Sequence, residues 1–548
     1  MIDRHHHRCL SLALLLGAFS ALVQAQTQPP QYTGIYAFNG NIEGASPDTP
    51  ALLAQGPDGL VYGTVPDFGN AGSGAWFQYA MSGAPTLFHM AGNSSLINGP
   101  LSPDTGLKSP HSGFMLGIDG SFYGSAQNVE NQNYGAIFKM WGDTVTTVFA
   151  FVDGPGTGLN AGPTNPSAPP VQGLDGNLYG VTYENGSANS GWIYQVILSA
   201  NGPAKLGWHF QLPSESHAPL FLANDGNLYG TYKNGSLSWG STTSGVVASP
   251  NGSGGIFGIG TTGVVTWFYN LNPSSSAFTG GDGLSPVGPV MQAADGNLYG
   301  TASGGGVNGG GVVYRIGLNG TGYIPIHGFQ TADGTAPMGG LVQGLDSNLY
   351  GLASQNGTLT TWEAMQGFIP EGTLFKLQTP NGANFTPLFT FFRASGANGT
   401  GPGANPQATP VLHTNGSIFG LTLEGGFKSN TNLPKGGLPE DTGEFFSWND
   451  GLKPFVSVVG QRSAHVGDRI TIIGQGFSTA TGITFGGVAG PWVKFNPTIY
   501  NDTSMSVTIP QGAKNGVITV LEPSGNLSTT YNFTIMCSYP FCLPIHRF

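Results

Sequence analysis

The stretch MQAADGNLYGTASGGG, from Met291 to Gly306, decides the fold. Its centre, Asp295-Gly296-Asn297, suits either a cation-binding loop or a turn between two short apolar segments. Variants of the phrase occur seven times, with turn residues 50 to 70 positions apart. These turn residues are Asp58, Asp119, Asp175, Asp225, Asp295, Asp346 and Asn415. Because Asp-Gly and Asn-Gly tolerate positive φ, the phrase predicts a type I′ hairpin turn, with a repeated cation site as the alternative.

Every copy has similar flanks. Four positions after the turn residue stands an aromatic residue followed by glycine, at Tyr62, Tyr123, Tyr179, Tyr229, Tyr299, Tyr350 and Phe419. A Gly-rich loop then leads to a second aromatic position, at Phe77, Phe138, Tyr194, Phe257, Tyr314, Phe375 and Phe446. A small turn and a further aromatic segment follow. Each unit therefore predicts four short strands in a meander, with buried rings and a glycine that allows close backbone approach.

Four-strand units at this spacing predict an all-β fold, a seven-bladed β-propeller over residues 26–452. The last unit has only three strands before the texture changes, while Tyr32 to Gly40 reads as a strand without a unit. We expect this N-terminal strand to complete the seventh blade and close the ring. The alternative is a linear stack of repeats, which would leave Tyr36 and Phe38 unpaired.

The repeat G-x-D-G-N-L-Y-G-T…G-G-I-F…L-F-x-F is clearest around Asp175, Asp225 and Asp295. It resembles the bacterial "GloVer" (Gloeo/Verruco) tandem repeat, roughly over residues 32–450. The resemblance implies an exported, surface-attached protein. It implies no catalytic residues, so none is assigned.

From Pro454, short runs of alternating apolar and polar residues predict a second all-β domain over residues 453–536. The matching stretches are Gly467-Asp468, Ile472 to Phe477, Ile483 to Gly487, Val507 to Pro510 and the last strand ending at Ile535. They resemble an IPT/TIG domain, which implies an immunoglobulin-like β-sandwich that acts as a spacer or accessory module.

The N-terminus predicts export. MIDRHHHRCLSLALLLGAFSALVQAQ has a basic start, an apolar run from Cys9 to Val23 and a small-residue cleavage site, so residues 1–25 read as a signal peptide. A membrane anchor is the alternative, but the run is shorter than the ~20 residues that a span needs. We expect no transmembrane segment in the mature chain. The expected location is secreted or cell-surface, with the periplasm as the alternative.

Residues 537–548 are predicted to be a short tail. In an exported chain its Cys537 and Cys542 predict a local disulfide, with a two-thiolate metal site as the alternative.

The composition indicates the fold class and argues against one class of partner. Glycine supplies 90 of 548 residues, aromatic residues 11% and charged residues only 8%, which is typical of short strands joined by many turns. The formal net charge of −11 argues against nucleic acid as a partner.

The connections between strands two and three of a unit, and between units, are long and differ in every copy. Variable loops on a rigid scaffold usually carry function, so we expect the ligand on this face, at the mouth of the axial channel. Candidate ligand-binding residues in these loops are Glu215, His217, Lys233, Trp239, Trp362, Glu363, Arg393 and Lys428. Exposed tryptophan beside Asn, Ser and Gly suits stacking on sugar rings. The alternative is that the tryptophans pin long loops and that Glu215 and His217 are solvated.

Three functions remain open. The favoured one is a surface or matrix protein that binds a polysaccharide or a surface protein and needs no cofactor. The second is a polysaccharide lyase or glycoside hydrolase with its site at the propeller axis. The third is a spacer without a specific ligand. The sequence contains no recognisable nucleophile elbow, metalloprotease or phosphate-loop motif.

Overall fold

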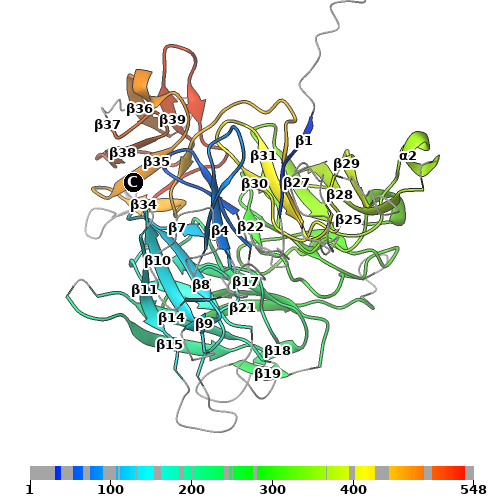
Figure 1. Ribbon diagram of the computed structural model, residues 1–548. Helices are drawn as coiled ribbons and strands as arrows, with labels where there is room; N and C mark the ends of the chain where they lie inside the picture. The colour runs from blue at the N-terminus through cyan, green and yellow to red at the C-terminus, as the bar shows by residue number, and fades with distance from the viewer. Residues whose placement is uncertain are drawn as a thin grey trace, which may run out of the picture.

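The computed structural model of this protein is almost entirely β-sheet (Figure 1). It describes residues 31–38, 53–65, 75–89, 107–108, 112–129, 134–142, 144–152, 162–183, 190–199, 201–239, 246–249, 251–275, 281–365, 367–393, 402–425, 443–486 and 497–536. Helical elements within these ranges are η1 (Thr331–Asp333), α2 (Thr361–Met365) and η2 (Phe477–Thr479). None of the helices in the described ranges is long and apolar enough to cross a membrane.

Seven four-stranded antiparallel sheets lie between residues 32 and 448, and we number them sheets 1 to 7. Sheet 1 is β2 (Leu53–Gln55), β3 (Val61–Val65), β4 (Ala75–Tyr79) and β5 (Thr86–His89). Sheet 2 is β7 (Met115–Leu116), β8 (Phe122–Ala126), β10 (Ala136–Trp141) and β11 (Thr144–Ala150). Sheet 3 is β12 (Val171–Gln172), β13 (Leu178–Val181), β14 (Trp192–Ile197) and β15 (Lys205–Gln211). Sheet 4 is β16 (Phe221–Leu222), β17 (Leu228–Tyr232), β20 (Gly255–Ile259) and β21 (Val265–Asn270). Sheet 5 is β22 (Met291–Gln292), β23 (Leu298–Ala302), β24 (Val312–Ile316) and β25 (Ile324–Gly328). Sheet 6 is β26 (Val342–Gln343), β27 (Asn348–Ala353), β28 (Ile369–Gln378) and β29 (Thr386–Arg393). Sheet 7 is β30 (Val411–Leu412), β31 (Ile418–Thr422), β32 (Glu444–Trp448) and β1 (Tyr32–Ala37). Two small pairs are inserted, β6 (Leu107–Lys108) with β9 (Asn128–Val129) and β18 (Ser236–Trp239) with β19 (Val246–Ser249).

The repeated Asp-Gly phrase forms the hairpin turn between the first two strands of each sheet. In the copy at Asp58, the Gly59 amide donates to the Gly56 carbonyl at 3.0 Å and the Gly56 amide donates to the Leu60 carbonyl at 2.9 Å. Only the glycine has positive φ, +80° at Gly59, whereas Asp58 does not. The predicted type I′ turn is therefore wrong. The pattern is a type I turn followed by a left-handed residue that forms a bulge, because the turn spans one residue more than the phrase suggests.

The aspartate side chain of the phrase locks this turn internally. In the copy at Asp295, Oδ1 accepts the Asn297 amide at 3.0 Å and Oδ2 accepts the Tyr299 hydroxyl at 2.6 Å. The corresponding tyrosine donates to its own turn aspartate in sheets 1 to 6. Both carboxylate oxygens thus have protein donors, so the hairpin turn explains the repeated aspartate and the alternative of a cation site is not needed.

Each sheet pairs the glycine of its second strand with the aromatic residue of its third. These cross-strand pairs are Gly63–Phe77, Gly124–Phe138, Gly180–Tyr194, Gly230–Phe257, Gly300–Tyr314, Gly351–Phe375 and Gly420–Phe446. A Cβ atom on any of these glycines would lie 2.2 to 2.5 Å from the opposite ring or its hydroxyl. The ring therefore lies directly over the glycine, which confirms the predicted close approach.

Neighbouring sheets share hydrophobic cores all along the chain, from sheets 1 and 2 to sheets 6 and 7. Sheet 7 also shares a core with sheet 1, in which the Phe77 and Phe445 ring centroids lie 5.2 Å apart. The first strands of neighbouring sheets touch, since β2 contacts both β7 and β30. Each sheet therefore shares a core with the next one, and the last sheet shares a core with the first.

A buried glutamine at the end of the first strand links four of the sheets to the preceding one. Gln172, Gln292 and Gln343 each accept a backbone amide from the turn of the preceding sheet, at 2.7 to 3.1 Å. Gln55 of sheet 1 accepts the Thr414 amide of sheet 7 at 2.9 Å in the same way. Sheets 7 and 1 are thus joined by the bond that joins consecutive sheets elsewhere.

The N-terminal strand β1 is the fourth strand of sheet 7. It pairs antiparallel with β32, from Tyr32 opposite Trp448 to Ala37 opposite Glu444, as predicted for this segment. The Tyr32 hydroxyl also contacts the Pro402 carbonyl at 2.8 Å and the Glu444 carboxyl group at 3.0 Å. Glu444 is only 1% exposed, and burial raises its pKa to about 8 despite the bond from Tyr32.

The C-terminal segment forms sheets around a hydrophobic core of its own. The strands are β33 (Ser457–Val458), β35 (Arg469–Ile473), β38 (Ser504–Thr508) and β37 (Thr498–Ile499) in one sheet, β36 (Gly482–Phe485), β39 (Ile518–Leu521) and β40 (Leu527–Ser528) in another, and the parallel pair β34 (Ser463–His465) and β41 (Thr534–Met536). Figure 1 shows this segment in orange and red beside the first sheets. It contacts the turns after first strands, since Thr503 donates to the Pro57 carbonyl at 2.9 Å and Thr414 to the Gly474 carbonyl at 3.2 Å.

Replacing Gly300 with alanine tests the glycine–aromatic pair. The new methyl group would lie 2.4 Å from the Tyr314 hydroxyl, and φ of Gly300 is not positive, so the strain is steric. We expect the free energy of unfolding in urea to fall by about 1–3 kcal/mol. In a Tyr314→Leu background the same change should cost much less, and equal costs in both backgrounds would contradict the pairing.

Replacing Glu444 with glutamine tests the buried acid under β1. The pKa of Glu444 is raised in the folded state, so the folded protein holds a proton that the unfolded chain releases between about pH 4.5 and pH 8. Stability contributed by this group is therefore present below pH 4.5 and is lost as the pH rises towards 8, by at most about 1.4 kcal/mol per pH unit. Urea unfolding from pH 5 to 8 should show a flatter dependence for Glu444→Gln. An equal pH dependence in the parent protein and in Glu444→Gln would contradict this role of the buried acid.

Candidate functional site

The meander sorts the connections onto two opposite ends of the sheets. Turns between the first and second strands and between the third and fourth strands lie at one end, which we call the short-turn face. The connections between second and third strands, and those leading to the next sheet, lie at the other end, the long-loop face. The C-terminal segment contacts the short-turn face, at Pro57 and Thr414.

Three predicted site residues from two loops of the long-loop face come together. Glu215 and His217 precede β16, and Lys233 follows β17. Lys233 Nζ lies 2.7 Å from Glu215 Oε1, and His217 Nε2 lies 3.6 Å from the same oxygen. The His217 ring packs edge-on against Tyr183, with centroids 4.9 Å apart. We call Glu215, His217, Lys233 and Tyr183 the Glu215 cluster.

The Glu215 cluster is partly sheltered from water. The side chains of Glu215, His217 and Lys233 are 17%, 25% and 38% exposed. His217 and Lys233 together lower the pKa of Glu215 to about 2, against the opposing effect of burial. A carboxylate with this pKa accepts hydrogen bonds at neutral pH but is poorly suited to act as a general acid there.

Trp239 ends strand β18 of the hairpin that follows Lys233 in the chain. Its ring lies against Phe268 of β21, with centroids 5.1 Å apart, yet the residue stays 61% exposed. The contact agrees with the alternative interpretation, in which Trp239 pins a long loop to the sheet. The exposed part of the indole leaves room for a sugar ring to stack on it. Both interpretations of Trp239 therefore remain compatible with its position.

Arg393 belongs to a different group on the same face. It ends β29 and pairs with Glu371 of β28, Nη2 to Oε2 at 3.3 Å, and with Glu424, which follows β31 in sheet 7. The sequence did not predict these two partners, because nothing in the spacing shows that sheets 6 and 7 bring both glutamates to one arginine. The structure does not place Arg393 with the Glu215 cluster.

The remaining candidates are accounted for separately. Glu363 caps helix α2, since its Oε2 accepts the Thr360 amide at 2.7 Å and the Thr360 hydroxyl at 2.8 Å, which gives it a local structural role. Lys428, Cys537, Cys542 and the side chain of Trp362 lie outside the described residues. Among the described residues, no three His, Cys, Asp or Glu side chains gather as a metal site.

Comparison with solved structures gives several distant similarities. The chain is similar to a fungal alcohol oxidase of the AA5 family in complex with copper, at 13% identity over 90% of this chain and 98% of that one, with a TM-score of 0.42. It is similar to Drosophila Semaphorin 2a at 10% identity over 92% and 98% of the two chains, with a TM-score of 0.38. A subtype N10 neuraminidase-like protein of A/little yellow-shouldered bat/Guatemala/060/2010 gives 10% identity over 63% and 95%, with a TM-score of 0.31. Scores this low support no argument about function.

The sequence comparisons show a family match over one part of the chain. No curated protein sequence matches the chain. Residues 239–452 match the model of the Gloeobacter/Verrucomicrobia repeat. The matched range runs from Trp239 through the last two strands of sheet 4, sheets 5 and 6 and most of sheet 7. For the copies before residue 239 the resemblance stays a prediction, as does the IPT/TIG resemblance of the C-terminal segment. The match to the Gloeobacter/Verrucomicrobia repeat is thus confined to residues 239–452.

Proposed function

We propose that the protein is an exported binding protein that holds a polysaccharide on the long-loop face, at the Glu215 cluster. The seven sheets serve as the blades of a closed seven-bladed β-propeller, and residues 453–536 serve as an IPT/TIG-like spacer on the opposite face. The closed ring is supported by the core that sheets 7 and 1 share and by the Gln55–Thr414 bond. Export is supported by the signal-peptide pattern of residues 1–25.

One observation carries the binding role. Two loops that differ in every repeat bring Glu215, His217 and Lys233 into one partly sheltered group of hydrogen-bonding side chains. Sugar hydroxyls pair well with such mixed donors and acceptors, and the exposed indole of Trp239 on the adjoining hairpin offers a face for ring stacking. The low pKa of Glu215 favours recognition over proton transfer.

The second candidate is a carbohydrate-active enzyme, and one observation favours it. Glu371 and Glu424 approach the same arginine from neighbouring sheets, so two carboxyl groups converge on the long-loop face. Paired carboxyl groups beside a bound sugar are the machinery of glycoside hydrolysis. Neither residue belongs to the Glu215 cluster, so the two functions can be tested separately.

The test incubates the mature protein with neutral and acidic polysaccharides and measures both retention and soluble products by mass spectrometry. We expect retention without products. Trp239→Ala and Glu215→Gln should each weaken retention roughly tenfold, since losing an interface anchor costs about 1–2 kcal/mol. The control is Trp141→Ala, because Trp141 is 63% exposed but ends β10 on the short-turn face.

Other outcomes would redirect the proposal. Oligosaccharide products that disappear in Glu371→Gln would establish the enzyme instead. Retention that Trp239→Ala, Glu215→Gln and Trp141→Ala leave unchanged would place the ligand elsewhere on the molecule. Retention on no polymer would contradict polysaccharide binding and favour a surface protein as partner.

A further inference from the structure

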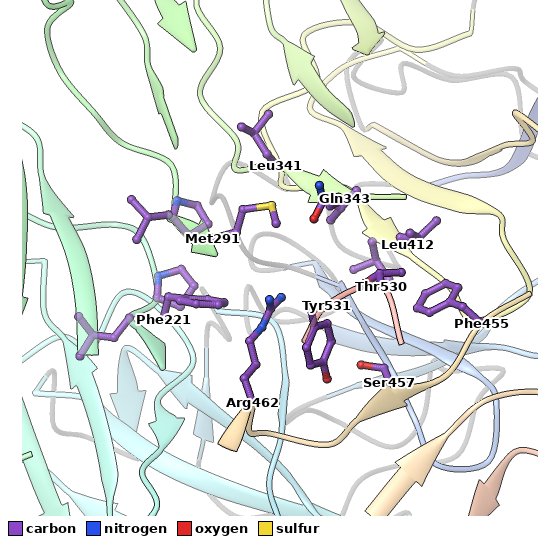
Figure 2. Close-up of a pocket in the computed structure, with 16 residues that line it drawn as sticks. Phe221, Met291, Leu341, Gln343, Leu412, Phe455, Ser457, Arg462, Thr530 and Tyr531 are labelled. Carbon is purple, nitrogen blue, oxygen red and sulfur yellow. The ribbon is translucent and has the colours of Figure 1, made fainter. Parts of the chain in front are cut away.

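A cavity of about 390 Å³ lies between the first strands of sheets 4 to 7 and the C-terminal segment, and no residue of the Glu215 cluster lines it (Figure 2). Phe221, Met291 and Leu412 line it from the sheets, and Phe455, Arg462 and Tyr531 line it from the C-terminal segment. The volume falls within the ~300–1,000 Å³ typical of small-molecule sites. The sequence did not point to this cavity, because its walls come from segments far apart in the chain.

Arg462 is the one charged residue among those that line the cavity. Figure 2 shows its guanidinium directed into the cavity between the rings of Phe221 and Tyr531. The guanidinium carbon lies 5.1 Å from the Phe221 centroid and 4.1 Å from the Tyr531 centroid. Two aromatic faces therefore hold the cation in place through cation–π contacts.

The guanidinium has unused hydrogen-bonding capacity. Nη1 donates to the Gln292 carbonyl at 2.7 Å, and no carboxylate of the described residues forms an ion pair with Arg462. Arginine has five N–H donors in a fixed planar fork. Burial lowers the pKa of Arg462, but an arginine stays protonated at neutral pH. Arg462 is partly buried, so its charge is incompletely hydrated and a ligand that supplies an anion is favoured.

The rest of the lining indicates the ligand's chemistry. Most of it is carbon, from Pro219, Met291, Leu341, Val411, Leu412 and Phe455. The polar side chains besides Arg462 are Gln343, Ser457, Thr530 and the Tyr531 hydroxyl. One forked cation suits the two oxygens of a carboxylate, whereas a multiply charged phosphate requires more donors.

We propose that this cavity binds a small carboxylate with an apolar or aromatic body, which pairs with Arg462 and rests against the aliphatic wall. The site is independent of polysaccharide binding on the long-loop face. It would join the C-terminal segment to the sheets, because the ligand touches both at once. Ligand binding should therefore stabilise the contact between them.

The test uses the whole mature chain with phenylacetate and hexanoate, and with phenylacetamide and hexanamide as neutral counterparts of the same shape. Binding is measured by isothermal titration calorimetry and ligand-observed NMR. At least one carboxylate should bind with a Kd of about 1 mM or tighter, and its amide at least about tenfold more weakly. Inorganic phosphate should also bind at least about tenfold more weakly than that carboxylate.

Three variants locate the site. Arg462→Met should weaken carboxylate binding by at least about tenfold, and Arg469→Met, which removes the arginine that bonds Ser506 and contacts Tyr500, should leave it unchanged. Because Arg462→Met also removes a contact between the segment and the sheets, Leu412→Trp provides a second test by filling the cavity while keeping the cation. It should abolish binding with the fold retained by circular dichroism.

The proposal is overturned by any of three results. These are no binding of either carboxylate up to about 10 mM, equal binding of carboxylate and amide, or unchanged binding in a folded Leu412→Trp variant. Loss of polysaccharide retention with intact carboxylate binding, or the reverse, would separate this site from the proposed function.

Discussion

The pairing of β1 with β32 is the interaction on which the rest of the structure depends. Without β1, strand β32 would be an open edge of sheet 7, and Phe38 would leave the core that sheet 7 shares with sheet 1. Open edges and exposed apolar faces favour association with other chains. The pairing joins residues about 410 positions apart and brings the two ends of the repeat region together. Burial of the Glu444 carboxyl group makes the stability of this junction depend on pH.

The repeated residues and the unique residues of the chain have different tasks. The turn aspartate, its tyrosine, the glycine–aromatic pair and the glutamine link recur because each sheet must be folded and attached to its neighbour. Glu215, Lys233 and Arg393 do not recur. They lie on the long-loop face, in two separate groups. The short-turn face is regular, and regular turns give the C-terminal segment a uniform surface to contact. The candidate binding residues are thus separate from the residues that maintain the fold.

Much of the fold could be predicted from the sequence, because short-range patterns report directly on strands and turns. The aromatic positions, the glycine opposite each ring and the N-terminal strand of sheet 7 were all predicted from the repeat. The turn type was wrong because the phrase Asp-Gly does not show how many residues precede it in the loop. The glutamine link was missed because only sheets 1, 3, 5 and 6 use it.

The site was less predictable, since it depends on contacts between distant segments. Glu215, His217 and Lys233 were assigned to one face from the sequence, but their contact with one another was not predicted. The partners of Arg393 come from two sheets, and Gln292 lies 170 residues before Arg462, so no local signal marks either contact. Glu363 also caps helix α2, a role that the sequence analysis did not predict.

Deleting residues 26–39 tests the closing role of β1 most directly, with removal of residues 26–30 alone as the matched control. If β1 closes the ring, the longer deletion lowers the free energy of unfolding by more than about 3 kcal/mol, because it exposes the edge of β32 and the core of sheets 7 and 1. The control should unfold like the parent protein in urea. Unchanged stability after the longer deletion would contradict closure by β1 and favour an open stack of repeats.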